Sequence, residues 1–165
     1  MLFKLKNLLL IPLALITLMI SACGFEPVYG TGGTGSALRG KVEVSAPDTV
    51  DTYLLVQNLE QRLGRSSNAE YDLNVTLETE FQGQAITASN ETTRYSIVGQ
   101  ADYTLLSVET GEIVASGNVR NFTGYSATGS TVDTLASERD ARKRLMMILA
   151  DQLTTQLYAT VELPK

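Results

Sequence analysis

Residues 71–81 read YDLNVTLETEF, the clearest alternation of apolar and polar side chains in the chain. One set would share a face: Tyr71, Leu73, Val75, Leu77 and Phe81. The other set would share the opposite face: Asp72, Asn74, Thr76, Glu78 and Glu80. Because successive side chains of a strand point to opposite faces, this period predicts a strand in a sheet with one buried and one solvated face.

A second long strand is predicted over residues 93–108, where apolar side chains again recur at every second position. They are Tyr95, Ile97, Ala101, Tyr103 and Leu105. The polar stretch 83–91 between the two strands is expected to be a loop.

A third strand is predicted over residues 113–125, after a hairpin turn at 109–112, which reads ETGE. Its alternation changes phase between Val119 and Phe122. A change of phase within one strand predicts a β-bulge, here near Asn121.

Before and after these three predicted strands, apolar residues recur at helical spacing and no longer at every second position. One helix is predicted from about Thr49 to Leu63, with Asp48 or Thr49 as its N-cap and Gly64 at its C-terminal end. Its apolar positions are Val50, Tyr53, Leu54, Leu59 and Leu63. Asp51 in its first turn suits the positive end of the helix.

A second helix is predicted from about Thr131 to Ala159, with Glu138 and Arg142 as an i,i+4 ion pair. Its apolar stripe consists of Ala141, Leu145, Ile148, Leu149 and Leu153. Charged residues lie across from this stripe: Asp140, Lys143, Arg144 and Asp151.

The short segment 41–46, KVEVSA, predicts one more strand before Pro47. The order is then β-α-β-β-β-α over a single domain, 41–165. This order predicts an α+β two-layer sandwich, with a four-stranded, mostly antiparallel sheet and two helices packed on one face. We expect the first strand to pair away from its neighbour in sequence, because a helix intervenes.

Residues 1–22 have the features of an export signal. Lys4 and Lys6 precede an apolar run from 8 to 20, and Ser21 and Ala22 are small residues suited to cleavage. The apolar run is too short to favour a permanent span, which needs about 20 residues. A short anchor that is retained is the alternative.

The charge of the remaining chain argues against general nucleic-acid binding. Removal of Lys4 and Lys6 with the signal leaves 11 basic and 18 acidic residues, a net charge of −7. No basic stripe stands out in the sequence, and nucleic-acid binders carry such a stripe.

Cys23 is the only cysteine, and the chain has no histidine. An internal disulfide, a Cys–His nucleophile pair and a Cys/His zinc site are therefore excluded. Neither a P-loop nor a dinucleotide-binding glycine motif follows a predicted strand. The glycine-rich stretch after Cys23 favours a flexible tether over 23–40, and we expect no enzymatic activity.

The residues Ile20-Ser21-Ala22-Cys23 resemble the lipobox of bacterial lipoproteins. The resemblance implies cleavage before Cys23 and a lipid attached covalently to its thiol, and we expect no other cofactor. Two or more acyl chains anchor a protein stably, whereas one is marginal. In such lipoproteins an aspartate directly after the lipidated cysteine resembles a mark for retention in the inner membrane. Gly24 occupies that position here, and the absence of aspartate favours the outer membrane.

The stretch CGFEPVYG at 23–30 resembles the start of mature lipoproteins of the LptE family, in its alphaproteobacterial form. The segments ADYTLLSVETGEIVASG at 101–117 and TLASERDARKRLMMILADQLTTQL at 134–157 are also similar to that family. The resemblance implies a periplasm-facing lipoprotein, anchored by its lipid in the outer membrane. It also implies a β-barrel partner, the lipopolysaccharide translocon, whose lumen the lipoprotein occupies while it helps assembly and lipopolysaccharide delivery.

Arg94 and Arg120 are candidate contacts for a lipopolysaccharide phosphate, because each lies in or beside a predicted strand of an acidic chain. A cross-strand ion pair with a glutamate is the alternative for each. Two other functions also remain open. One is an accessory lipoprotein subunit of another envelope system, such as a lipid transporter or a cell-wall synthase. The other is an exported enzyme, which the absence of histidine disfavours.

Overall fold

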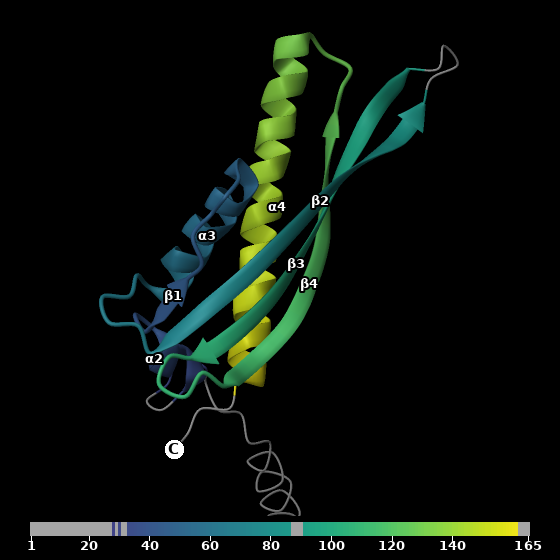
Figure 1. The fold of residues 1–165 in the computed structure, drawn as a ribbon. Coiled ribbons are helices and arrows are strands. Elements are labelled where there is room, and N and C mark those ends of the chain that lie inside the picture. Colours follow the sequence, from purple (N-terminus) through teal and green to yellow (C-terminus); the bar gives the residue numbers. More distant parts are fainter. Residues whose placement is uncertain (1–27, 29, 31–32, 87–90, 162–165) are drawn as a thin grey trace, which may run out of the picture.

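The structure, a computed structural model, describes residues 28, 30, 33–86 and 91–161. Its elements are α2 (Thr34–Leu38), β1 (Val42–Val44), α3 (Val50–Leu63), β2 (Tyr71–Ile86), β3 (Thr92–Ser107), β4 (Ile113–Ser126) and α4 (Thr131–Thr160). The four strands form one sheet in the order β1-β2-β3-β4. Helices α3 and α4 lie on the same face of this sheet (Figure 1). The predicted α+β two-layer sandwich is therefore confirmed.

Strands β2, β3 and β4 form the predicted antiparallel meander. Leu73 on β2 lies opposite Leu105 on β3, which in turn lies opposite Ala115 on β4. All three side chains are buried and belong to the hydrophobic core beneath the helices. We call this side of the sheet the inner face and the opposite side the outer face.

The first strand pairs differently from our expectation. β1 lies parallel to β2, the next strand in the sequence, with Val42 opposite Tyr71 and Val44 opposite Leu73. The intervening helix α3 is 14 residues long, and a crossover of that size lets two consecutive strands run side by side in parallel. The sheet is therefore mixed, with one parallel and two antiparallel pairs.

Strand β2 is longer than its side-chain pattern predicts, so the expectation of a loop over 83–91 is wrong for residues 83–86, while residues 87–90 lie outside the described part of the chain. β2 continues to Ile86 and β3 begins at Thr92. Register shifts accompany this extension, between Gly83 and Ala85 and between Ala85 and Ile86. Backbone pairing extends the hairpin here although apolar alternation has ended.

The predicted β-bulge near Asn121 is also wrong. β3 and β4 remain in register through Asn121, and their register shift lies near the other end of the pair, beside Leu106. Thr123 is buried on the inner face and donates a hydrogen bond of 2.9 Å to the carbonyl oxygen of Ala141. Phe122 lies on the outer face and is exposed. The hydrogen bond satisfies the buried threonine, so the strand continues without a change of phase.

Helix α3 begins and ends as its sequence predicts. The Thr49 side chain accepts a hydrogen bond from the backbone N–H of Thr52, and the Thr52 hydroxyl accepts one from the N–H of Thr49. This reciprocal pair is a capping box. Gly64 caps the C-terminus with a φ of 78°, a conformation that favours glycine.

Helix α4 is the longest element and closes the core. Its buried side chains include four of the five residues of the predicted stripe: Ala141, Leu145, Leu149 and Leu153. Ile148 is half-buried beside them, while Met146 is buried and Met147 is exposed. The four charged residues predicted across from the stripe are all exposed.

Part of the expected tether belongs to the folded domain. Within 23–40, residues Thr34–Leu38 form the short helix α2, and Leu38 is fully buried in the core. The Thr34 hydroxyl donates a hydrogen bond of 2.8 Å to the carbonyl oxygen of Tyr158 near the end of α4. The folded domain therefore begins before residue 41.

Candidate functional site

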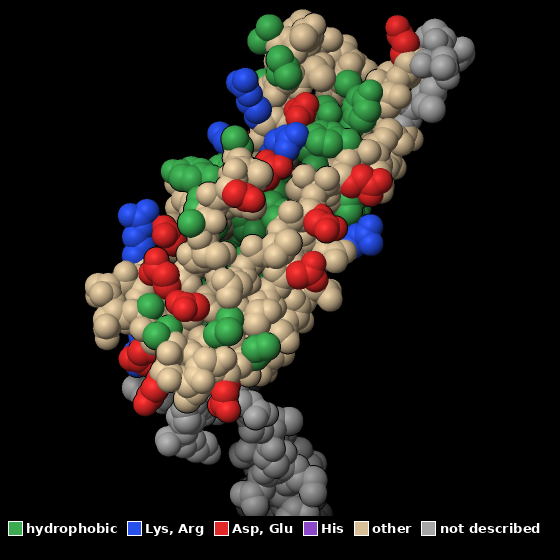
Figure 2. Space-filling view, viewed as in Figure 1, with side chains coloured by type: hydrophobic (Ala, Val, Ile, Leu, Met, Phe, Trp, Pro, Cys, Tyr) green, Lys and Arg blue, Asp and Glu red, His purple; other side chains and the backbone are tan. Residues whose placement is uncertain are grey.

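The two layers diverge at one end of the molecule. There the distal parts of β2 and β3 turn away from the first turns of α4 (Figure 1). We call this region the open end, formed by residues 79–86 of β2, 92–98 of β3 and 131–138 of α4. Apolar side chains are visible between the helix and the strands at this end (Figure 2).

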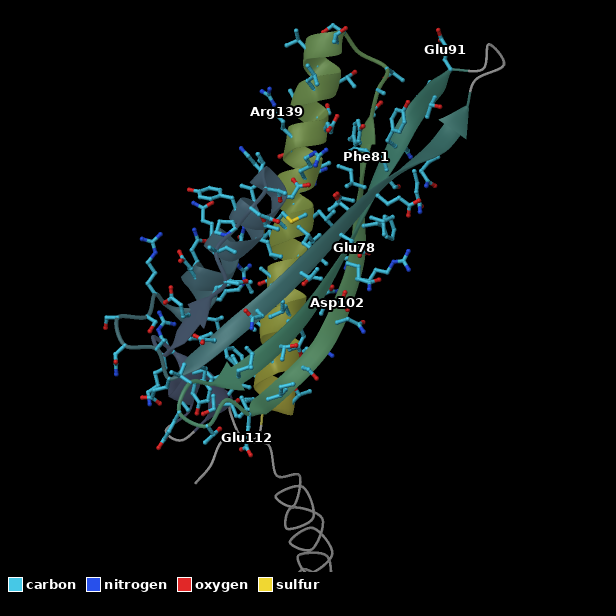
Figure 3. All side chains as sticks on the ribbon, in the orientation of Figure 1. Glu78, Phe81, Glu91, Asp102, Glu112 and Arg139 are labelled. Atoms are coloured by element: carbon cyan, nitrogen blue, oxygen red, sulfur yellow. The ribbon has the colours of Figure 1, made fainter. Side chains whose placement is uncertain are left out.

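Aromatic side chains line the strand side of the open end. Phe81 extends from β2 toward α4 (Figure 3) and is 43% exposed. Tyr95 of β3 stacks on Tyr125, which lies opposite it on the adjoining strand β4, with ring centroids 5.5 Å apart. Burial raises the pKa of the Tyr125 hydroxyl, and the nearby Glu138 carboxylate adds to this shift. Tyr125 therefore stays neutral at physiological pH.

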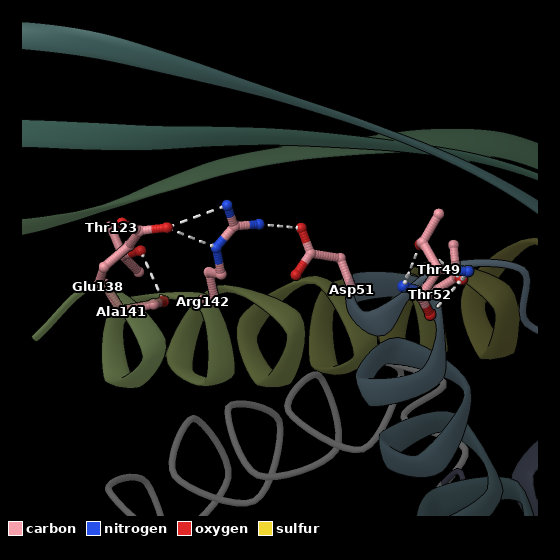
Figure 4. Close-up of polar contacts among 7 residues, drawn as sticks. All are labelled: Thr49, Asp51, Thr52, Thr123, Glu138, Ala141 and Arg142. Atoms are coloured by element: carbon pink, nitrogen blue, oxygen red, sulfur yellow. Dashed lines mark hydrogen bonds and ion pairs between the residues drawn. The ribbon is translucent and has the colours of Figure 1, made fainter. Parts of the chain in front are cut away.

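Arg142 joins the helices beneath the open end (Figure 4). Its Nη1 lies 2.5 Å from Oδ2 of Asp51 in the first turn of α3. Its Nη2 lies 3.1 Å from Oε1 of Glu138, the predicted i,i+4 partner. The guanidinium carbon is 4.8 Å from the centre of the Phe81 ring. Two carboxylates thus neutralise this cation, which leaves it poorly suited to bind an anionic ligand.

Asp51 is the member of this network that sequence reasoning missed. The sequence pattern places Asp51 only at the helix terminus, yet this residue is 8% exposed and its Oδ1 has no hydrogen-bond partner among the described residues. The contact with Arg142 joins residues 91 positions apart. Nothing in the local pattern of either helix signals a contact at that separation.

The outer face carries both arginines singled out from the sequence, but it does not bring them together. Arg94 lies opposite Ser126, and Arg120 lies opposite Gln100. Six residues of β4 separate the two positions, about 20 Å along a strand. One phosphate cannot contact both arginines.

Neither arginine forms an ion pair with a carboxylate in the described part of the chain. The alternative of a cross-strand pair with a glutamate is therefore not observed. Arg94 borders a hollow of about 560 Å³ together with Gln84, Ser96 and Phe122. Arg120 borders another of about 500 Å³, beside Asp151 of α4.

Cys23 lies outside the described residues, and its lipidation remains a prediction. Within residues 28, 30, 33–86 and 91–161, no group of three or more His, Cys, Asp or Glu residues is placed to hold a metal ion. No helix in these ranges combines the length and apolar character needed to span a membrane.

Comparison with known families identifies the chain. The model of the LptE lipopolysaccharide-assembly family matches residues 40–157, from the start of β1 almost to the end of α4. The chain belongs to the LptE family. No curated protein sequence matches this LptE-family chain.

Solved structures similar to this LptE-family chain agree with its fold. A lipoprotein from Caulobacter crescentus superimposes with a TM-score of 0.65 at 20% identity, covering 79% of this chain and 96% of the other. Rare lipoprotein B from Shewanella oneidensis gives 0.56 at 12% identity, covering 73% and 93%. Lipoprotein B from Nitrosomonas europaea gives 0.56 at 15% identity, covering 73% and 83%. At these identities the likeness establishes the fold alone.

Membership of the LptE family supports a role in lipopolysaccharide assembly. The family consists of non-enzymatic lipoproteins and is associated with lipopolysaccharide transport. A lipoprotein family of this kind also indicates a location in the cell envelope.

Proposed function

We propose that this LptE-family chain is an outer-membrane lipoprotein that pairs with the lipopolysaccharide translocon β-barrel and plugs its lumen. In this role it aids assembly of the barrel and delivery of lipopolysaccharide to the outer leaflet. The family match over residues 40–157 carries the proposal, because it spans almost all of the folded domain.

Two features of the chain support this assignment. The lipobox-like residues 20–23 end an export signal, which accounts for a lone cysteine without a partner. The domain is acidic and its outer face is largely polar, which is compatible with the polar interior of a membrane β-barrel.

Depletion of the chain tests the role, with co-purification as a second measurement. We expect depletion to leave the barrel misassembled and lipopolysaccharide absent from the outer leaflet. The affinity-tagged lipoprotein, extracted from membranes, should retain the barrel. Normal surface lipopolysaccharide after depletion would contradict the proposal, and retention of a cell-wall synthase or an inner-membrane transporter in place of the barrel would favour the accessory-subunit alternative.

We also propose that Arg94 or Arg120 contacts a phosphate of lipopolysaccharide. Because the two lie about 20 Å apart along the sheet, each is tested singly as Arg94→Glu and Arg120→Glu. Arg39→Glu is the control, since Arg39 is an exposed arginine beyond the end of α2, outside the sheet. The variant that replaces the contacting arginine should bind purified lipopolysaccharide several-fold more weakly than wild type, at an unchanged melting temperature. Wild-type binding by both variants would reject these contacts.

A further inference from the structure

Strand β2 has an edge that the sheet leaves open. β3 pairs with β2 from Tyr71 to Ile86, whereas β1 pairs with it only from Tyr71 to Leu73. Ser45 extends the β1 side slightly, because its N–H donates to the Leu73 carbonyl at 2.9 Å and its hydroxyl accepts from the Val75 N–H at 3.2 Å. Beyond Val75, no described segment pairs with β2 on this side.

The direction of the free backbone groups follows from these contacts. The Tyr71 N–H donates to the Lys41 carbonyl, and the Leu73 carbonyl accepts from Ser45, so the peptide groups of these odd-numbered residues point away from β3. Peptide groups alternate in direction along a strand, and β2 stays in register with β3 as far as Gly83. Leu77, Thr79 and Phe81 therefore each present an N–H and a C=O to the open edge.

The surroundings of this edge differ on its two sides. On the inner side, Leu77 is half-buried and Phe81 is partly exposed toward the open end. A cavity of about 380 Å³ begins at Leu77 and reaches Pro47 before α3. On the outer side, Glu78 and Glu80 are exposed beside the edge, and neither forms an ion pair with a described residue. The inner side of the edge therefore offers two apolar side chains, Leu77 and Phe81, with the exposed Thr79 between them, and the outer side is acidic.

We propose that the open edge of β2, from Leu77 to Phe81, accepts an extended strand of the barrel partner. This inference rests on the proposed function. Addition of a strand would satisfy the free N–H and C=O groups, and side chains at alternate positions would provide specificity. Inward residues of the incoming strand would be apolar and cover Leu77 and Phe81. Outward residues would be Lys or Arg, because they lie beside Glu78 and Glu80.

The acidic pair also decides against a second copy of this chain as the occupant. Two β2 edges pairing with each other would bring Glu78 and Glu80 close to the same carboxylates of the other copy, and like charges across strands are destabilising. The far edge of the sheet, on β4, is a weaker candidate. There Arg144 of α4 already donates to the Gly124 carbonyl at 3.3 Å.

Co-purification of the barrel with full-length, lipidated variants tests the inference. Glu78→Lys keeps the fold, because the side chain is exposed, but places a like charge beside the basic strand. We expect about fivefold less retained barrel, from the loss of one favourable cross-strand pair and its replacement by an unfavourable one. Glu112→Lys makes the same charge change at the opposite end of the molecule (Figure 3) and should retain the barrel as wild type does.

Two further variants probe the backbone directly. Thr79→Pro removes one N–H from the edge and should also lower the retained barrel, since proline is tolerated on edge strands but cannot donate. A photo-crosslinking amino acid at Glu80 should link to one short extended segment of the barrel. The same group at Glu112 is the control and should not link to that segment.

The outcomes separate this inference from the function on which it rests. If the wild-type chain retains no barrel, both fail. If Glu78→Lys and Thr79→Pro retain as much barrel as wild type, only the edge inference is overturned. Crosslinks from Glu80 that reach only another copy of this chain would overturn it as well.

Discussion

Replacement of Arg142 by methionine should destabilise the domain far more than the same replacement of Arg144, two residues further along α4. The change removes the charge but keeps an unbranched apolar side chain against Phe81. It leaves Asp51 without its ionic partner, 2.5 Å from where the guanidinium stood. The Asp51 side chain is only 11% exposed, so water cannot fully replace the lost contact.

The expected loss can be worked out from these contacts. Removal of one partner of a fully buried ion pair costs about 3–5 kcal/mol, whereas an exposed pair is worth about 0–1 kcal/mol. The Arg142 side chain is 27% exposed, which places this pair nearer the buried limit. Loss of the cation–π contact with Phe81 adds about 0.5–1 kcal/mol. We therefore expect a decrease of about 2–4 kcal/mol in the free energy of unfolding.

Urea unfolding of the domain, followed by circular dichroism, measures this decrease. Arg144→Met is the matched control, since Arg144 forms an i,i+4 pair with Asp140 in which the side chains are 46% and 63% exposed. We expect that control to cost less than about 1 kcal/mol. Asp51→Asn in the Arg142→Met background should recover part of the loss, because it removes the unpaired buried charge.

Two results would refute this reasoning. Equal losses for Arg142→Met and Arg144→Met would show that burial of the Asp51 contact does not strengthen it. A double variant with Asp51→Asn no more stable than Arg142→Met alone would show that the loss comes from packing, not from an isolated carboxylate.

Three other changes test the packing and caps. Gly99→Ala should cost about 1–3 kcal/mol, because its Cβ would lie 2.9 Å from a leucine of α4; Gly124→Ala, whose nearest neighbour is 3.6 Å away, should cost clearly less in the same urea titration. Leu38→Ala should lower the free energy of unfolding by about 2–4 kcal/mol, because Leu38 of α2 is buried in the core. A thermal melt that matches wild type would show that α2 does not stabilise the folded domain. Ser130→Ala should cost about 1 kcal/mol at pH 7 through loss of the N-cap. Hydrogen bonds from the Ser130 side chain and backbone also lower the pKa of the Asp133 carboxyl below its ordinary value. The part of this loss due to Asp133 should therefore be present at pH 7 and vanish as the pH falls through the folded pKa, as melts at pH 7 and at a pH below that pKa would show.

Side-chain periodicity predicted the elements of this fold well, because the core is built from it. The alternation over 71–81 and the helical stripe around Leu145 each mark a face that must be buried. Thr123 shows where this reasoning fails. A polar residue at an inward position has the same sequence pattern as a phase change, and the strand register and the hydrogen bond to Ala141 show that the phase continues.

Features that depend on backbone pairing or on distant contacts could not be predicted in this way. The hairpin beyond Gly83 is held by strand pairing, which the side-chain pattern does not show. The parallel placement of β1 depends on how α3 crosses the sheet, not on the residues of β1 itself. For the candidate site, the sequence indicated two exposed arginines on one face, but their separation appeared only once the strand register was known.

The length of the domain favours a barrel over the membrane surface as the partner at the open edge. α2, which follows Cys23 in the chain, packs near the C-terminal end of α4, and the open end lies at its N-terminal end. The 30 residues of α4 span about 45 Å, more than the roughly 30 Å of a bilayer's hydrocarbon core. The open end therefore lies at the opposite end of α4 from α2, and an acidic domain of this length needs polar surroundings throughout. A protein that surrounds the domain along its length can reach the β2 edge and pair with its free N–H and C=O groups, whereas lipids have no backbone to add as a strand, and this is why we assign the incoming strand to the barrel.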